Sequence, residues 1–380
     1  FYVIGFKPHF EMYITPLNID PEKPALPISH PFIYSVYLAK LQGSFITLGE
    51  ANDTWALNEG VLNEKAFLDL TYSNHAEWEL MFFNAIRKTK KGMSVCVFET
   101  TDSIQHMFWR YLDKDHPALR SGQNAMSSRV IEDLYVRMDA LVGKILAELG
   151  SRDILIVMSD HGFKSFSRGV NLNTWLHRNG YLALKDGREE SEEWFKNVDW
   201  DKTRAYALGL GGVYINQKGR EAMGTVLPGG ETTALKAELI RKLNGLRDGE
   251  KNKTAVNIVY DRDAVYAGPY RENAPDLIIG YNEGFRASWD SVTGKVTRTV
   301  FEDNPKAWSG DHCIDPECVP GVFFSSLKMK DAAPSIMDIA PTVLDLFGLA
   351  APAHMDGRSL LPEASDAVRA KNRTRKKGTK

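Results

Sequence analysis

The sequence predicts an α/β protein with a mostly parallel central sheet and helices on both of its faces. Short apolar runs of strand length, at residues 94–98, 154–158 and 321–324, alternate with amphipathic helical segments. The run at 154–158 is continuous and partly β-branched, which is typical of a buried parallel strand. A right-handed βαβ unit from 94–98 to 154–158 would place its helix on a face of the sheet.

The helix inside this unit is predicted from about Ser128 to Leu149. One stripe of this segment carries Leu134, Met138, Leu141, Ile145 and Leu149, and Gly150 ends it. A second helix is predicted over 335–347, with Pro341 tolerated early in it and Gly348 just past its end.

Residues 164–273 are less regular in pattern. They contain a polar stretch at 185–202 and the glycines of the GLGG segment at 209–212. These glycines lack the third glycine of a dinucleotide fingerprint and do not stand between a strand and a helix, so a tight turn is the better interpretation. We expect the whole segment to form an insertion that caps the entrance of a site.

Five side chains of metal-ligand type stand near the predicted strands. Asp102 and His106 are four residues apart, so a helix that begins after 94–98 would place both on one face of its first turn. Asp160 and His161 come just past the carboxyl end of 154–158, the edge at which open α/β sheets bind ligands. His312 lies in the loop before 321–324.

Each of these signals alone has an ordinary explanation. Asp102 and His106 fit a surface pair on a helix, Asp160 and His161 an ordinary loop dipeptide, and His312 a loop histidine with a local partner. The conjunction of all three with strand ends favours a metal site instead.

These motifs carry a resemblance to a known group of proteins. DxxxH, then a strand followed by SDHG, then GDH, in this order, resemble the alkaline phosphatase superfamily, most closely its type I phosphodiesterase/nucleotide pyrophosphatase branch. Segments 204–221, 275–281, 308–324 and 335–349 resemble such proteins too, so the likeness extends from about Pro27 to Leu361. The last segment is shared with sulfatases and phosphoglycerate mutases and supports the superfamily rather than the branch.

The resemblance implies a fold and a ligand set. The fold would be a three-layer αβα sandwich, with residues 1–365 forming one hydrolase domain that is incomplete at its amino end. Asp102, His106 and His312 would bind one divalent ion, and Asp160 and His161 would bind a second. The ligands are imidazoles and carboxylates without thiolates, which suits Zn²⁺ first and Mn²⁺ as an alternative.

The resemblance also implies a Thr or Ser nucleophile and one further Asp near the start of the domain, which have no match here. The chain begins at Phe1, and its first residues resemble the stretch that follows the nucleophile. We therefore expect the chain to be a carboxyl-terminal part of a longer protein or a truncated gene product. The hydroxyls of Thr15 and Ser29 follow no strand-Asp motif and are poor candidates.

The activity implied is hydrolysis of phosphate esters, as a phosphodiesterase or nucleotide pyrophosphatase acting on small molecules. A sulfatase-like or phosphonate-ester hydrolase of the same superfamily, and a catalytically incomplete metal-binding chain, remain alternatives. Arg168 and Arg286 are candidates for contact with the substrate phosphate, although a surface ion pair explains either arginine as well. Trp55, with Asn58 and Glu59, is a candidate for the wall of the same cleft.

Composition limits the partners. The 380 residues have a formal net charge of −2 and are 43% hydrophobic, which favours a globular enzyme over a nucleic-acid binder. No apolar run approaches the roughly twenty residues of a membrane span. Cys313 and Cys318 are compatible with a disulfide or a reduced pair, and the basic segment 366–380 with a disordered tail. Nothing in the sequence indicates an oligomeric state.

Overall fold

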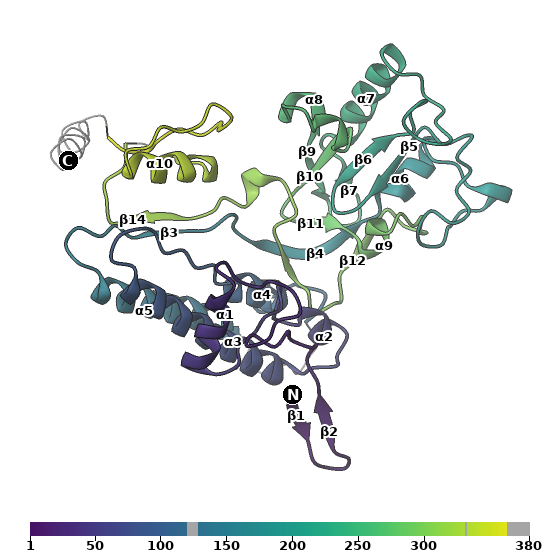
Figure 1. The fold of residues 1–380 in the computed structure, drawn as a ribbon. Helices are drawn as coiled ribbons and strands as arrows, with labels where there is room; N and C mark the ends of the chain where they lie inside the picture. The colour runs from purple at the N-terminus through teal and green to yellow at the C-terminus, as the bar shows by residue number, and fades with distance from the viewer. Residues whose placement is uncertain (120–127, 331–332, 363–380) are drawn as a thin grey trace. The chain divides into compact units, whose positions relative to one another are not determined.

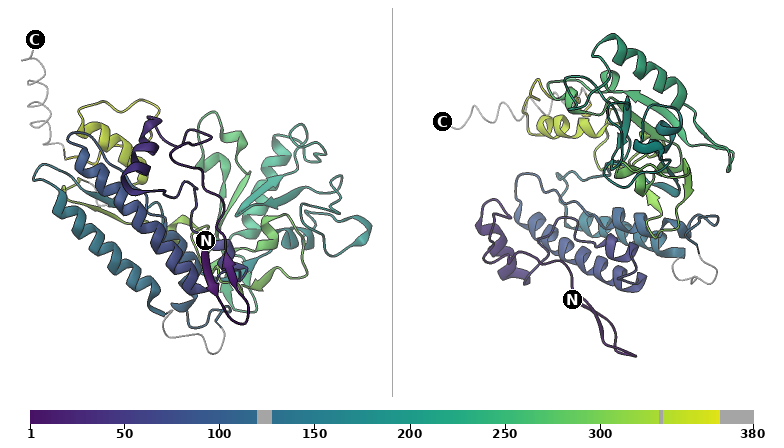
Figure 2. Two further views of the ribbon diagram at one scale, coloured as in Figure 1. Left: turned by 60° about the horizontal axis from the view of Figure 1, so that its bottom comes forward. Right: turned by 90° about the vertical axis from the view of Figure 1, so that its right-hand side faces the viewer.

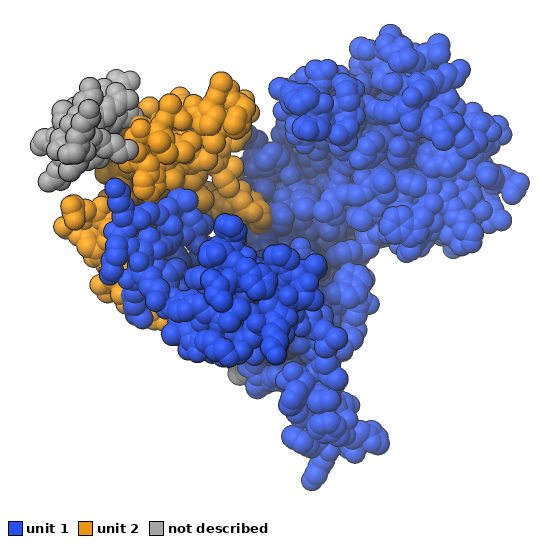
Figure 3. All heavy atoms as spheres, viewed as in Figure 1, with its two compact units in different colours: residues 1–142, 163–319 blue, residues 143–162, 320–380 orange. Residues whose placement is uncertain are grey.

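The computed structural model describes residues 1–119, 128–330 and 333–362. The chain divides into two compact units, one made of residues 1–142 and 163–319 and the other of residues 143–162 and 320–380 (Figure 3). Each unit is therefore built from two separate stretches of the sequence.

The described chain begins with two strands, continues through the helices α1 to α5 with no strand between them, and mixes strands with helices after them (Figure 1). The α-helices are α1 Ile33–Gln42, α2 Thr54–Asn58, α3 Glu64–Lys88, α4 Thr100–Phe108, α5 Val130–Glu148, α6 Leu172–Arg178, α7 Gly230–Leu243, α8 Arg262–Val265, α9 Trp289–Val292 and α10 Ile339–Leu346. Short 3-10 turns are η1 Trp109–Tyr111, η3 Lys185–Gly187, η4 Arg271–Asn273, η5 Pro316–Cys318 and η6 Ile336–Asp338.

The strands form small sheets. They are β1 Tyr2–Gly5, β2 Glu11–Tyr13, β3 Ile156–Met158, β4 Lys164–Val170, β5 Ala205–Leu208, β6 Gly212–Ile215, β7 Arg247–Asp248, β8 Lys253–Thr254, β9 Val256–Asp261, β10 Leu277–Tyr281, β11 Gly284–Ala287, β12 Phe301–Asp303, β13 Gly310–Asp311 and β14 Phe323–Ser325. In the first unit the sheet orders are β5-β6-β10-β9 and β11-β4-β12, and β13 also pairs with β4.

The two larger apolar clusters of the first unit position its sheets and helices. Strands β5, β6, β9 and β10 bury their side chains against α6 and α7, with Leu176, Leu239 and Leu277 fully buried. Helices α3, α4 and α5 pack around Phe67, Phe108 and Leu134, and Figure 2 shows α3 and α5 running side by side. The second cluster is the one that fixes the helix carrying Asp102 and His106.

The second unit contains β3, β14, η6 and α10. β3 pairs with β14 in antiparallel register. The Ser335 hydroxyl and the Asp338 carboxylate form a capping box at the start of η6. Asp338 also accepts the backbone N–H of Arg358, which ties the segment after α10 back to the helix.

Much of the predicted secondary structure is confirmed. The predicted helix 128–149 is α5, and Leu134, Leu141 and Ile145 of its stripe are buried. The predicted helix 335–347 is η6 followed by α10, and Gly348 beyond it has a positive φ of 68°. GLGG forms the turn between β5 and β6, where Gly209 has φ 74°.

The α/β class is confirmed, but the mostly parallel pairing is not. Among the described pairs, β11 with β4 is parallel and the others are antiparallel. The predicted strand 94–98 is wrong as an element, because it pairs with no described strand and Val95 and Val97 are 68% and 74% exposed. A continuous apolar run indicates that a segment tends to be buried, but it does not specify the direction of a neighbouring strand.

The segment predicted as an irregular cap is more regular than its sequence suggests. Residues 164–273 contain β4 to β9 and α6 to α8, and they supply much of the larger apolar cluster. Their role as a cap stays a prediction, as does the single domain over 1–365. The predicted tail 366–380 lies outside the described residues. In the part of the chain that is described, no helix is both long and apolar enough to cross a bilayer.

Candidate metal centre

Helix α4 carries the first two candidate ligands. Its apolar residues Ile104, Met107 and Phe108 are fully buried, so packing fixes the rotation of the helix about its axis. Asp102 and His106 then share the other face, and Asp102 Oδ1 lies 3.5 Å from His106 Nε2. The sequence prediction of one helical face for these two residues is confirmed.

The third ligand reaches this face because β13 packs against α4. Gly310 pairs with Ser165 of β4, and its carbonyl oxygen lies 2.7 Å from His106 Nδ1. A Cβ at position 310 would lie 2.5 Å from the Gln105 carbonyl oxygen, so glycine permits this close approach. His312 follows directly, with Nε2 at 3.6 Å from Asp102 Oδ1.

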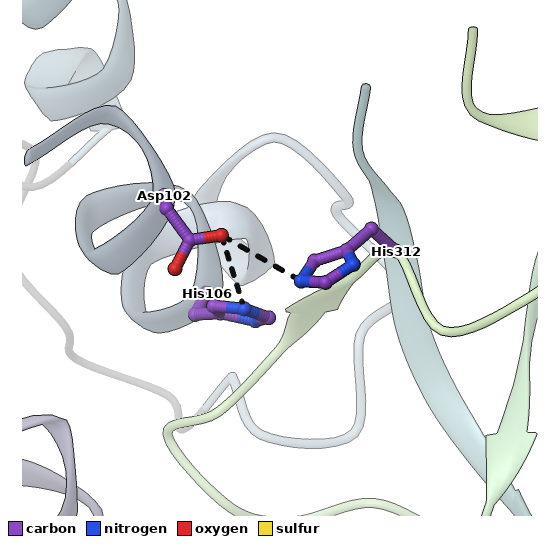
Figure 4. A group of neighbouring side chains, drawn as sticks. All are labelled: Asp102, His106 and His312. Carbon is purple, nitrogen blue, oxygen red and sulfur yellow. Dashed lines mark ion pairs between the residues drawn. The ribbon is translucent and has the colours of Figure 1, made fainter. Parts of the chain in front are cut away.

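The three side chains point toward one another (Figure 4). One Asp102 oxygen lies between the two imidazoles, and the ligand atoms of the three residues are within 4.8 Å of one another. Two ligands that each lie about 2.0–2.1 Å from a tetrahedral Zn²⁺ are about 3.3 Å apart, so the observed pairs need little movement to bind one ion.

Hydrogen bonding fixes the orientation of the His106 ring. Because the Gly310 carbonyl can only accept, His106 Nδ1 is an N–H donor, and Nε2 is the ring nitrogen on the side of Asp102. Metal-binding histidines in proteins have this arrangement, in which a carbonyl or carboxylate fixes the tautomer from behind. The donor set and its orientation therefore fit one divalent ion.

Charge around the centre favours a cation. Burial raises the pKa of Glu99, at the start of α4, and the carboxylates of Glu50 and Asp102 raise it further. Burial also opposes ionisation of Asp311, but the Arg286 guanidinium and His106 outweigh it and lower the pKa of this carboxyl. Burial and the nearby Asp311 carboxylate raise the pKa of the Cys313 thiol to about 12, so this thiol stays protonated. Cys313 and Cys318 are both free thiols.

Asp160 and His161 lie in the second unit, directly after β3. His161 Nε2 is 3.4 Å from Asp160 Oδ2, and the side chain of Asp160 is 72% exposed. Among the described residues, the groups of three or more candidate ligands are Asp102 with His106 and His312, and Asp311 with His312 and Cys313. The assignment of Asp160 and His161 to a second ion stays a prediction.

The two predicted phosphate-binding arginines have other partners. Arg168 is buried and pairs with Asp248 and Asp303, both at 2.7 Å, and with Glu250. Arg286 is buried too, with Nε 2.7 Å from Asp311 Oδ2. Carboxylates distant in sequence therefore lie against both guanidinium groups, and contact of either arginine with a substrate phosphate stays a prediction.

The other residues that the sequence singled out, Ser29, Trp55 and Asn58, make contacts within the fold. Ser29 Oγ donates to the carbonyls of Pro31 and Phe32 and accepts the N–H of Ser35, so it organises the start of α1. Trp55 lies against Trp289, and Asn58 accepts the backbone N–H of Trp308. The first contact connects α2 with α9, and the second connects α2 with the segment that precedes β13.

Two residues beside the ligands escaped the sequence interpretation. The Trp308 ring stacks on His106 with centroids 3.8 Å apart, and its Nε1–H donates to Asp311 Oδ2 over 2.8 Å. Both residues belong to the WSGDHC motif that contains His312. Their nearness in sequence to His312 was the signal that could have indicated them. An Asp directly before a loop histidine, however, forms no sequence pattern that distinguishes it from other loop residues.

The fold and the site define an α/β protein with a candidate imidazole-carboxylate metal site between a helix and a loop. Residues 32–303 match the type I phosphodiesterase / nucleotide pyrophosphatase family, and the chain belongs to this family. A solved structure of human ectonucleotide pyrophosphatase/phosphodiesterase 5 is similar at 15% identity with a TM-score of 0.39, over 76% of this chain and 61% of that chain. No curated protein matches the chain.

Proposed function

We propose that this chain supplies the metal-binding part of a phosphodiesterase or nucleotide pyrophosphatase that hydrolyses small phosphate esters or nucleotides. Membership of the family supports the reaction class. The observation that carries the proposal is the convergence of Asp102, His106 and His312 on one point, with the orientation of the His106 ring fixed by a hydrogen bond.

A divalent ion in such a centre supplies a Lewis acid for phosphoryl oxygens and lowers the pKa of a bound hydroxyl or water. The residues of this chain have separate tasks toward it. Asp102 would bring negative charge to the exposed side of the centre, and His106 and His312 would each bring an imidazole nitrogen. Zn²⁺ is the first choice and Mn²⁺ the alternative, because the donors are nitrogen and oxygen.

The finer parts of the proposal come from the resemblance. Asp160 and His161 would contribute to a second ion. A Thr or Ser nucleophile and one further Asp would complete it, and we place neither in this chain. Two ions would stabilise the attacking and leaving oxygens of an in-line displacement.

Metal analysis combined with three substrates tests the proposal. The dialysed chain is assayed for bound zinc and manganese, then for hydrolysis of bis-p-nitrophenyl phosphate, p-nitrophenyl phosphate and p-nitrophenyl sulfate. We expect bound metal and, where turnover occurs, preference for the diester. Faster release from the sulfate would favour a sulfatase, and metal binding without any turnover would favour an incomplete centre.

A matched pair of variants assigns the metal to the proposed residues. His312→Ala removes one ligand and should lower metal affinity by more than the roughly 10–100-fold that loss of an outer partner costs. His177→Ala is the control, because His177 Nδ1 contacts the Leu182 carbonyl outside the centre. Equal metal affinity in the two variants would count against the assignment.

A further inference from the structure

The carboxylate of Asp311 is the most heavily bonded group beside the centre. Its Oδ1 accepts the backbone N–H groups of His312 and Cys313, both over 2.8 Å. Its Oδ2 accepts Trp308 Nε1–H over 2.8 Å and lies 2.7 Å from Arg286 Nε. A carboxylate has about four lone-pair positions; three of them accept hydrogen bonds here, and the Arg286 guanidinium adds a positive charge at close range.

This occupancy separates Asp311 from the metal ligands. Asp311, His312 and Cys313 form a second group of candidate ligand atoms within 4.8 Å of one another. Binding of an ion by Asp311 would, however, displace a backbone donor, the indole or the guanidinium from a carboxylate that is 1% exposed. The charge of Asp311 is therefore neutralised by groups of the protein rather than by an ion.

Arg286 anchors Asp311 from within the core. The guanidinium carbon lies 4.9 Å from the centre of the Phe166 ring and 4.7 Å from that of Trp289, and the side chain is 5% exposed. A guanidinium held between two rings has few alternative positions. The ion pair is therefore a fixed point against which the loop of His312 is held.

Asp311 is also connected to His106, through Trp308 and through the neighbouring residue Gly310. Trp308, which donates to Asp311, stacks on the His106 ring, and the Gly310 carbonyl next to Asp311 accepts from His106 Nδ1. The backbone of His312 is bound directly. One carboxylate thus holds the surroundings of both imidazoles shown in Figure 4.

We propose that Asp311, held by Arg286 and Trp308, is a positioning residue that presents His106 and His312 to the metal. The inference rests on the proposed metal site and deepens it. Asp311 binds no ion itself, and its removal changes the angle between the two imidazoles rather than the number of ligands. This role also accounts for the burial of Arg286.

The test compares Asp311→Asn with Asp248→Asn. Asp248 is the matched control, because it too is a buried carboxylate with an arginine Nε at 2.7 Å, but its partner is Arg168 and it contacts no metal ligand. Co²⁺ is titrated into each full chain, and its visible absorption bands report both affinity and ligand geometry.

We expect Asp311→Asn to weaken Co²⁺ binding about 10–100-fold and to shift the bands, as loss of an outer partner does. Asp248→Asn should leave both unchanged even where it lowers stability. Wild-type affinity in Asp311→Asn, or equal weakening in the control, overturns the inference. Absence of Co²⁺ binding in the wild-type chain would instead refute the metal site itself.

A second variant decides the matter if Asp311→Asn does not fold. Trp308→Phe keeps the Asp311–Arg286 ion pair and an aromatic ring beside His106, and it removes one donor from the carboxylate. Weaker Co²⁺ binding with a shifted spectrum supports the positioning role. An unchanged titration overturns it.

Discussion

Two buried arginines on adjacent strands, Arg168 of β4 and Arg286 of β11, have nearly the same immediate geometry but different surroundings. Each places Nε 2.7 Å from a buried aspartate, Asp248 for the first and Asp311 for the second. Arg168 then continues to the carboxylates of Glu250 and Asp303, which are 65% and 44% exposed. The Arg168 pair therefore connects the core to the surface.

The Arg286 pair connects the core to the candidate metal centre. Its aspartate binds the backbone of His312 and the indole that stacks on His106. The comparison teaches that burial and ion pairing alone do not reveal a functional role. What distinguishes the two pairs is the set of groups on the far side of the carboxylate.

The largest expected effect comes from removing each cation in turn. Arg286→Met and Arg168→Met each leave a buried aspartate without its partner, and such losses cost about 3–5 kcal/mol of unfolding free energy. Urea denaturation should show a destabilisation of this size for both variants. Co²⁺ affinity, measured on the folded fraction, should fall for Arg286→Met alone, and a parallel fall in Arg168→Met would erase the distinction between the pairs.

A smaller effect is expected from filling two tight glycine positions. In Gly310→Ala the new Cβ would lie 2.5 Å from the Gln105 carbonyl oxygen, and in Gly169→Ala it would lie 2.9 Å from Ser288 Cβ. Overpacking of this kind costs about 1–3 kcal/mol. Both variants should lower the thermal midpoint, but only Gly310→Ala moves the carbonyl that fixes His106. Identical metal titrations for the two would contradict this difference.

The smallest effect concerns β4, which carries Arg168 and pairs with β11, the strand of Arg286. His116 Nε2 donates to the Phe166 carbonyl of β4 and its Nδ1 accepts from Ala118, so the ring is neutral in the fold. Burial lowers the pKa of His116 from its ordinary value of 6.5, in spite of the carbonyls nearby. Below pH 6.5 the unfolded chain therefore takes up a proton that the folded chain does not bind.

Stability should accordingly be lost as the pH falls through this window, by up to about 1.4 kcal/mol per pH unit. The His116→Gln variant lacks this pH-dependent contribution to the free energy of unfolding. The difference in unfolding free energy between the wild type and the variant should therefore shrink between pH 6.5 and 5. Urea denaturation of both proteins across pH 5–8 measures the change. Parallel stability profiles would show that His116 titrates alike in both states.

The sequence was informative where a pattern is local. The stripe of α5, the helix at 339–346 and the turn at Gly209 follow from periodicity and from glycine placement, and the structure confirms them. Asp102 and His106 were predicted to share one helical face for the same reason. Their approach to His312 rested on a family resemblance and not on spacing.

Contacts between distant residues could not be predicted in the same way. Nothing in the sequence around Arg286 shows that Asp311 lies beside it, so this partner of the guanidinium was not predicted. The direction of pairing at β3 was predicted as parallel, whereas its described neighbour β14 is antiparallel and comes from residues 323–325. Local sequence specifies which groups are apolar or charged, and tertiary packing decides which of them meet.

The hydrogen bond between His106 and Gly310 joins residues 204 positions apart in the sequence. Before α4 and β13 come together, His106 has neither its fixed orientation nor His312 as a neighbour, so the unfolded chain offers an ion little more than scattered side chains. An ion that binds this centre would act as a reversible cross-link between two distant parts of the chain. Each tenfold rise in free metal above its dissociation constant would then add about 1.4 kcal/mol to the stability of the fold.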